Sequence, residues 1–312
     1  TEKFGTQNFE MEKPLLDQIE QQFEVYRKTT DEAERKAIYK VIDSLSYEAS
    51  KISIPNEYDK LMSAIGANGT NAYTSYDVTC YTEDIPSNQI ENWAKIQADR
   101  FQNATIRGFH TESETVYEEK NMSLTNDIRK VLEKINTLLF PNHPYGTQTV
   151  LGTQEHLKNP SITNIKNYHK TWYVPNNMAI CLSGDFNPDE MIAIIDKYFG
   201  DMQPNPNLPK LEFPKEKEIT EPIVAEVVGL EAESVFLSWR FPGAGHPDGE
   251  KLELLSQILF NGTAGLFDLN LIQQQKVLYG LCTPFTMSDY SAFIMYGGPK
   301  QGQTLEEVKD LF

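Results

Sequence analysis

One order of elements is expected twice in this sequence. Residues 70–101 predict a strand pair, a turn and a helix, because Thr, Tyr and Val are enriched after a Gly-rich turn at 66–69. Residues 279–312 predict the same order, with two strands and a final helix that begins near Thr304. Between them, residues 203–222 hold five of the 17 prolines, which is typical of an extended linker. The repetition predicts two similar α+β domains in tandem.

Composition excludes several classes of protein. The chain has 28 Lys and Arg against 45 Asp and Glu, a formal net charge of −17, which argues against binding to nucleic acid or to an anionic membrane surface. No apolar run approaches the roughly 18–20 residues that span a bilayer. The three cysteines, Cys80, Cys181 and Cys282, are too few and too far apart for a disulfide framework or a cysteine zinc site. The composition therefore indicates a soluble, acidic, globular chain.

Hydrophobic periodicity predicts the remaining elements. Apolar stripes in residues 11–50 predict a helical hairpin, and the wholly apolar run Met178–Ser183 predicts a buried strand. Ser87 is expected to cap the helix at 86–101. Apolar spacing and flanking Pro or Gly residues predict further helices at 112–139, 162–171, 188–199 and 250–260, and a strand at 235–241.

Glu112 and Glu119 form the one acidic pair that suggests a chemical site. They lie seven residues apart on the expected helix, so both carboxylates share one face with Val116 between them, whereas Glu118 points elsewhere. A carboxylate on a rigid helix, supported by a second acid, is what a zinc ligand needs. Acidic residues in the first turns of a helix also interact favourably with the helix dipole and with solvent. The spacing alone therefore leaves a purely structural role open.

Five segments occur in a recognisable order along the chain. They are residues 66–81, Asp99–Phe101, Glu112–Glu119, His143–Gly146 and Tyr173–Asp185. Together they resemble the insulinase/pitrilysin family of zinc metallopeptidases, which includes mitochondrial processing peptidase. The resemblance covers nearly the whole chain apart from a helical hairpin inserted at about residues 11–57. It implies two tandem homologous domains, residues 1–215 and 216–312, each an antiparallel-rich sheet covered by helices.

In that family an inverted H-x-x-E-H helix supplies two histidine ligands and the glutamate that activates water. The resemblance implies that Glu119 is the third zinc ligand and that Glu112 is its supporting acid. This sequence departs from the pattern, because it contains no H-x-x-E-H and no two of its five histidines are four residues apart. The family's zinc helix runs into a turn similar to Phe4–Thr6, so we expect the chain to begin just past the motif. Such a fragment is expected to be inactive by itself.

Residues 216–312 are expected to form the family's degenerate, non-catalytic repeat. Leu259–Thr263 resembles the end of the zinc helix, but Glu253–Gln257 takes the place of the motif and lacks every ligand. The last helix has no stop signal before Phe312. This domain is therefore expected to be incomplete at its C-terminus.

Peptide binding by strand addition is the second feature that the resemblance implies. In this mode an extended substrate adds to an exposed sheet edge through main-chain hydrogen bonds. The matching edge consists of Asn71, Ala72, Tyr73 and Thr74. The small Ala72 would let the substrate backbone approach, Asn71 could hydrogen-bond it, and the outward backbone groups should be unpaired. A half-buried structural strand is the alternative interpretation.

The expected function is metal-assisted peptide hydrolysis by an intact zinc endopeptidase, of which this chain is a fragment. A non-catalytic partner subunit or peptide-binding scaffold of the same fold is the alternative, and the presence of both Glu112 and Glu119 favours the enzyme. The implied partners are a peptide substrate and a second half or partner subunit that completes a clamshell, without nucleic acid or membrane. The bacterial periplasm or cell envelope is favoured over the cytoplasm, although three lone thiols fit a reducing compartment equally.

Overall fold

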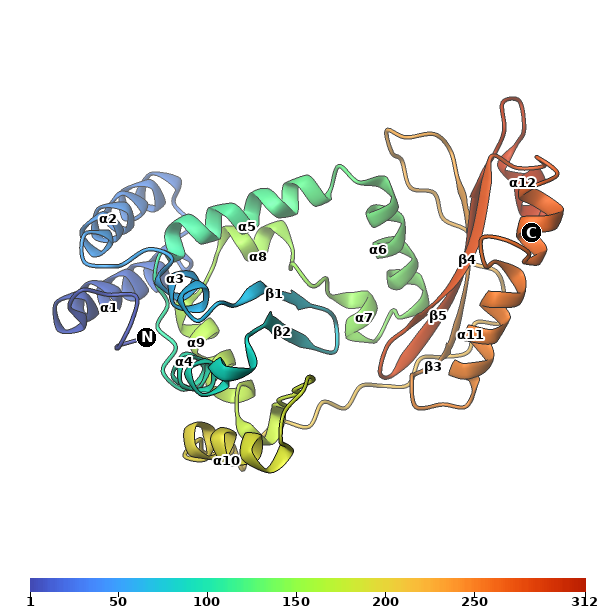
Figure 1. Ribbon diagram of the computed structural model, residues 1–312. Coiled ribbons are helices and arrows are strands. Elements are labelled where there is room, and N and C mark those ends of the chain that lie inside the picture. Colours follow the sequence, from blue (N-terminus) through green and yellow to red (C-terminus); the bar gives the residue numbers. More distant parts are fainter. The chain divides into compact units, whose positions relative to one another are not determined.

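The computed structural model describes residues 1–312 and divides into two units by backbone contacts (Figure 1). The first unit comprises Thr1–Tyr73, Thr79–Lys120 and Gly152–Glu212, and the second comprises Thr74–Val78, Asn121–Leu151 and Phe213–Phe312. The mixture of helices and antiparallel sheets confirms the predicted α+β class. The units follow contacts only, so the predicted domain boundary at residues 215 and 216 stays a prediction. None of the helices combines the length and the apolar character needed to cross a bilayer.

The first unit opens with the predicted helical hairpin, α1 (Phe9–Tyr26) and α2 (Glu32–Ser50). Each helix starts at a side-chain cap, since Asn8 accepts from the Met11 N–H and Asp31 accepts from the Glu34 N–H. The apolar stripes of the two helices meet, and their fully buried members include Phe23. The remaining elements of the unit are α3 (Glu57–Ala64), β1 (Asn68–Thr74), β2 (Thr79–Asp84), η1 (Ser87–Gln89), α4 (Ile90–Gln102), α5 (Phe109–Ser123), α8 (Gln154–Lys158), α9 (Ile162–Trp172), η2 (Pro175–Asn177) and α10 (Pro188–Phe199).

The predicted strand pair and the helices at 162–171 and 188–199 are confirmed, but three local predictions are wrong. Ser87 does not cap an α-helix, because Ser87–Gln89 forms a 3₁₀ turn and α4 begins at Ile90. The helix predicted over 112–139 is two helices, because α5 ends at Ser123 and α6 begins at Asp127. The Asn126 side chain accepts the Arg129 N–H there, and this local bond starts a new helix.

The buried strand predicted at Met178–Ser183 is also absent. Most of this segment is exposed, and no backbone hydrogen bond joins it to another segment. The sheet of the first unit consists of β1 and β2 only. An apolar run becomes a strand when a neighbouring ladder satisfies its N–H and C=O groups, and no ladder is present beside this one.

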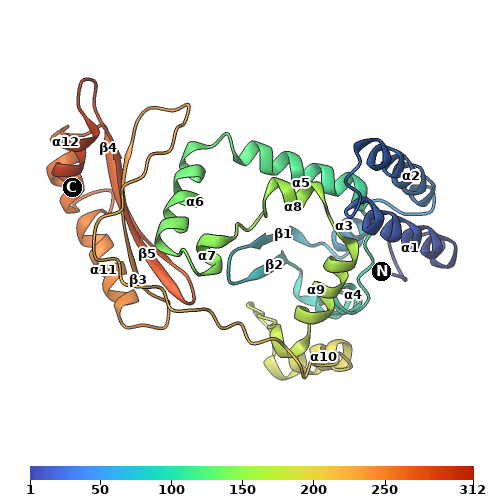
Figure 2. The same cartoon turned by 180° about the vertical axis from the view of Figure 1, so that it is seen from behind.

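The second unit contains a three-stranded antiparallel sheet in the order β3–β5–β4. Its helices lie on both faces of this sheet, with α11 and α12 on one side and α6 and α7 on the other (Figures 1 and 2). The predicted strands and the capped final helix are confirmed, with the Thr304 capping box at the start of α12. The elements are α6 (Asp127–Leu139), α7 (Pro144–Thr147), β3 (Val235–Pro242), α11 (Asp248–Leu259), η3 (Asp268–Ile272), β4 (Tyr279–Thr286), β5 (Tyr290–Gly298) and α12 (Leu305–Leu311).

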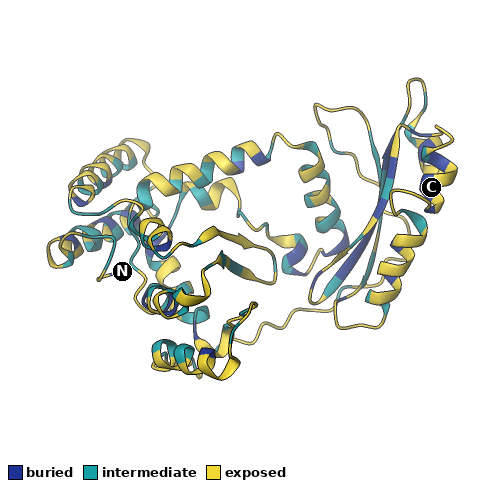
Figure 3. Cartoon of the chain, viewed as in Figure 1, coloured by how far each residue is buried: buried dark blue, intermediate teal, exposed yellow.

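The central strand β5 supplies the core of the second unit from both of its faces. Ala292 and Ile294 pack against Phe140 and Tyr145 on the side of α6 and α7, whereas Phe293 faces the opposite cluster under α11. This is the period of two that a central strand imposes. Figure 3 shows the contrast along the chain: β5 is buried for most of its length, while β1 is exposed throughout.

Candidate peptidase site

Helix α5 places Glu112 and Glu119 on one face, as the spacing predicts. Both side chains are exposed, and Val116 between them is half-buried. Glu114, on a different face, accepts a 2.6 Å hydrogen bond from the hydroxyl of Tyr39. Burial and this carboxylate raise the pKa of Tyr39. Glu114 is therefore fixed by a structural contact, whereas Glu112 and Glu119 face solvent on a rigid helix.

The histidines do not complete a metal site around Glu119. No three His, Cys, Asp or Glu side chains of the chain converge as metal ligands would. His110 lies 3.5 Å from an Asp43 carboxylate oxygen, and the buried His143 lies 3.1 Å from one of Asp289. A catalytic zinc takes three protein ligands. The residues of this chain therefore do not fit a catalytic zinc by themselves.

Strand β1 is the exposed element that the sequence predicts as a substrate edge. It pairs only with β2, so its other edge is open, and all seven of its residues are exposed. Tyr73 is 58% exposed. The Ala72 N–H is not unpaired as expected, because it donates to Oδ1 of Asn71 at 2.9 Å. The side chain of Asn71 thus covers a backbone donor of its own strand.

The backbone of Ala72 is directed away from β2. The Ser75 N–H donates to the Val78 carbonyl at 2.8 Å where the hairpin turns, and alternate residues of an antiparallel strand direct their backbone groups to the same side. The backbone N–H and C=O of Tyr73, two residues before Ser75, therefore face β2. The side chain of Tyr73 is hydrogen-bonded to that of Cys80, which lies opposite on β2. Ala72 in between presents its N–H and C=O to the open edge.

A partly buried polar network around Glu83 of β2 was not apparent from the sequence. Glu83 on β2 accepts from the Tyr58 hydroxyl at 2.5 Å, from Nε1 of Trp93 at 2.5 Å and from Nε2 of Gln97 at 2.7 Å. Burial and Glu83 raise the pKa of Tyr58 to about 12. Arg100 also donates to the Tyr58 hydroxyl at 2.9 Å. The sequence pointed to this region only through Asp99–Phe101, one of the five segments that carry the family resemblance. The network holds the strand that supports β1.

The stability of the first unit should depend on pH through His169. It stacks on Tyr173 with ring centroids 4.6 Å apart, and burial lowers its pKa from 6.5. The unfolded chain therefore takes up this proton first as the pH falls, so the contribution to stability is complete above about pH 6.5 and is lost towards the lower folded pKa. We expect His169→Gln to reduce the difference in urea midpoint between about pH 7.5 and pH 5.5. The exposed His156→Gln is the matched control, and an equal change in both variants would contradict this assignment.

Comparison with known proteins decides the family. Residues 29–153 match the family model described as "Insulinase (Peptidase family M16)", and residues 161–312 match the model described as "Peptidase M16 inactive domain". The chain belongs to the M16 peptidase family. It therefore contains both types of M16 domain, N-terminal and C-terminal, in tandem, as the repeated order of elements predicts.

Individual relatives of this M16 chain are zinc proteases and processing peptidases by name. A "Zinc protease PqqE" of Helicobacter pylori is 22% identical over 275 residues, which cover 85% of this chain and 61% of that protein. A "Probable mitochondrial-processing peptidase subunit beta" of Schizosaccharomyces pombe is 26% identical over 148 residues, 46% of this chain and 32% of that one. The M16 chain thus spans less than two thirds of the length of these relatives.

A solved structure has the same fold. The crystal structure of a protease from Helicobacter pylori superposes with a TM-score of 0.72 at 22% identity, covering 81% of this chain and 62% of that one. The roles of Glu112, Glu119 and Asn71–Thr74 stay predictions, for which the structure provides exposed positions on a helix and on a strand edge.

Proposed function

We propose that this M16 chain is part of a zinc-dependent endopeptidase that hydrolyses peptides bound as an added strand along Asn71–Thr74. The observation that carries the proposal is the open edge of β1, which is exposed along its whole length and directs the Ala72 backbone outward. Main-chain pairing at such an edge binds extended peptides with little dependence on their sequence. The names of the relatives support zinc-dependent proteolysis as the chemistry.

Helix α5 is proposed to supply one zinc ligand and one residue that orients this ligand. In the proposal Glu119 provides a carboxylate oxygen to zinc and Glu112 orients it from two helical turns away. Bound zinc would supply an activated water. The histidine ligands and the general base would come from an H-x-x-E-H helix outside these residues. This chain by itself is therefore proposed to bind peptides without cleaving them.

The 312-residue chain should hold no stoichiometric zinc and cleave no peptide. One exposed carboxylate cannot replace three ligands, so any bound zinc should be weak and lost on desalting. Metal analysis of the desalted protein and hydrolysis of a quenched fluorescent casein peptide check this expectation. One tightly bound zinc per chain, with peptidase activity that chelation removes, would contradict it.

A non-catalytic partner subunit or peptide-binding scaffold is the second candidate. The match of residues 161–312 to a model described as an inactive domain favours it for that half of the chain. Both candidates bind peptides at β1, and they differ at α5, because a scaffold does not need Glu119. In either case we propose that a second half or partner subunit encloses the peptide, as two halves of a clamshell would. A bacterial periplasmic or envelope location stays part of the proposal.

A further inference from the structure

The tip of the β1–β2 hairpin is fixed separately from its strands. Thr74–Val78 belong to the second unit, whereas β1 up to Tyr73 and β2 from Thr79 belong to the first. Within the second unit, Asp77 of the tip accepts two hydrogen bonds: the Tyr145 hydroxyl donates to Oδ1 at 2.6 Å, and the Ser288 N–H donates to Oδ2 at 3.0 Å. Ser288 lies in the turn between β4 and β5.

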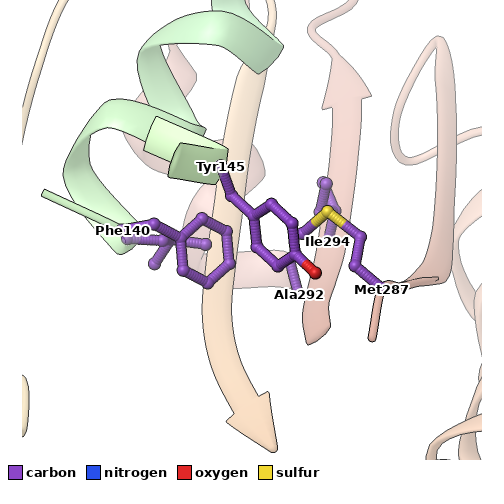
Figure 4. Close-up of a cluster of buried hydrophobic side chains, with 6 residues drawn as sticks. Phe140, Tyr145, Met287, Ala292 and Ile294 are labelled. Atoms are coloured by element: carbon purple, nitrogen blue, oxygen red, sulfur yellow. The ribbon is translucent and has the colours of Figure 1, made fainter. Parts of the chain in front are cut away.

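The receiving surface is rigid because it is built around a buried aromatic ring. Tyr145 is 3% exposed, and its ring lies between Phe140 and Met287 (Figure 4). The rings of Phe140 and Tyr145 meet edge to face, with centroids 5.8 Å apart. Tyr76 of the tip packs against the same cluster, and its ring centroid lies 5.3 Å from that of Tyr145. The Tyr76 hydroxyl also donates to the Gln148 carbonyl at 3.4 Å and accepts from Nδ2 of Asn136 at 3.5 Å. The tip is therefore held by the packing of Tyr76, by these two long hydrogen bonds and by the two shorter ones that Asp77 accepts.

His143 and Asp289 orient the hydroxyl that reaches Asp77. Nδ1 of His143 accepts the Tyr145 N–H at 3.3 Å, so the ring proton is on Nε2, which donates to Asp289 at 3.1 Å. The Asp289 N–H in turn donates to the Tyr145 hydroxyl oxygen at 3.2 Å. With its oxygen accepting from Asp289, the hydroxyl donates its proton to Asp77. Burial and Asp77 raise the pKa of Tyr145, so the phenol keeps this proton at neutral pH.

We propose that Asp77 and Tyr145 are positioning residues for peptide binding, because they fix the hairpin tip and thereby the course of the β1 edge, whose last residue, Thr74, lies three residues before Asp77. This inference rests on the proposed function. A strand edge binds a peptide through several hydrogen bonds in register. If the backbone of the edge becomes more mobile, peptide affinity falls even when the residues of the edge are unchanged, because binding must then order that backbone. Neither residue touches the peptide. They act through Ser75 and Thr74 on Ala72.

The test compares phenol deletions at two places in the 312-residue chain. Tyr145→Phe removes the hydroxyl that reaches Asp77 and keeps the buried ring. Tyr39→Phe, the control, removes a hydroxyl that donates to Glu114 at the same 2.6 Å distance, away from the hairpin. The probe is a fluorescein-labelled, unstructured casein peptide, and the readouts are its Kd, amide hydrogen exchange in residues 70–82 and the unfolding midpoint.

We expect Tyr145→Phe to weaken peptide binding about tenfold and to speed exchange in β1, while Tyr39→Phe changes neither. Asp77→Ala, which also loses the hydrogen bond from the Ser288 N–H, should have at least as large an effect. Asp77→Asn should keep part of the affinity through its amide oxygen, and Asp77→Ala combined with Tyr145→Phe should be no worse than Asp77→Ala alone. These surface variants at Asp77 keep the test valid if Tyr145→Phe unfolds. Unchanged Kd and exchange in both single variants, in a chain whose wild type binds the peptide, would overturn the inference and leave the proposed function standing. A wild type that binds no peptide would overturn both.

Discussion

Ala72→Pro is expected to abolish peptide binding while the chain stays folded. The Ala72 N–H faces the open edge, so proline removes a donor that the peptide would use and places a ring where the peptide backbone would lie. Within the chain this N–H bonds only the Asn71 side chain, so no hydrogen bond to β2 is lost. Proline is tolerated on edge strands for this reason. Fluorescence titration with the casein peptide and thermal unfolding check the two halves of the prediction.

Ala72→Gly is the matched control for this change. Glycine keeps the N–H and the space above it, so peptide affinity should stay close to that of the wild type. If Ala72 faced β2 instead, proline would break a ladder bond and should lower the free energy of unfolding by about 3 kcal/mol or more, by analogy with a helix interior. A folded Ala72→Pro chain with normal affinity would remove β1 from the site.

Glu119→Gln is expected to remove most of the zinc from a protein in which an H-x-x-E-H helix precedes this chain. An amide is a much poorer zinc ligand than a carboxylate, and the loss leaves two protein ligands where a catalytic zinc needs three. Glu112→Gln should cost less metal and still lower activity by about 10–100-fold, which is typical of residues that orient a ligand. Zinc content after dialysis and peptide hydrolysis measure the two effects separately.

Glu114→Gln is the control on the same helix. Its side chain bonds Tyr39 and lies on another face, so zinc content should not change. Equal zinc in the Glu119→Gln protein and the unsubstituted protein would show that α5 supplies no ligand. It would then favour the scaffold interpretation for this part of the chain.

The elements that the sequence predicts well are those with local signals. The α1–α2 hairpin follows from two apolar stripes, and the structure adds caps at Asn8 and Asp31. The β4–β5 pair lies where two strands are predicted, and Ala292 and Ile294 of β5 are buried. Each of these signals is contained within about twenty residues, so no knowledge of distant contacts is needed.

The features that the sequence could not predict include those that depend on neighbours far along the chain. Met178–Ser183 has the composition of a strand, but a strand exists only where a ladder accepts it. The contact between Asp77 and Tyr145 joins residues 68 positions apart, and no pattern in either segment points to the other. In the candidate site, the positions of Glu112 and Glu119 on one helix face could be predicted from spacing, whereas the internal bond between Asn71 and Ala72 could not.

The hydrogen bond between Asn71 and Ala72 affects the tendency of the chain to aggregate at high concentration. Asn68–Thr74 has no charge and no proline, and exposed strand edges of this kind are where proteins aggregate. The Asn71 carboxamide occupies the Ala72 donor that a neighbouring molecule would need first. A chance encounter that offers one hydrogen bond gains nothing by displacing it, because one bond is exchanged for another. A ligand that forms hydrogen bonds with several backbone groups still gains the bonds other than the one at Ala72. The strand therefore favours an extended peptide over a neighbouring molecule that offers a single hydrogen bond.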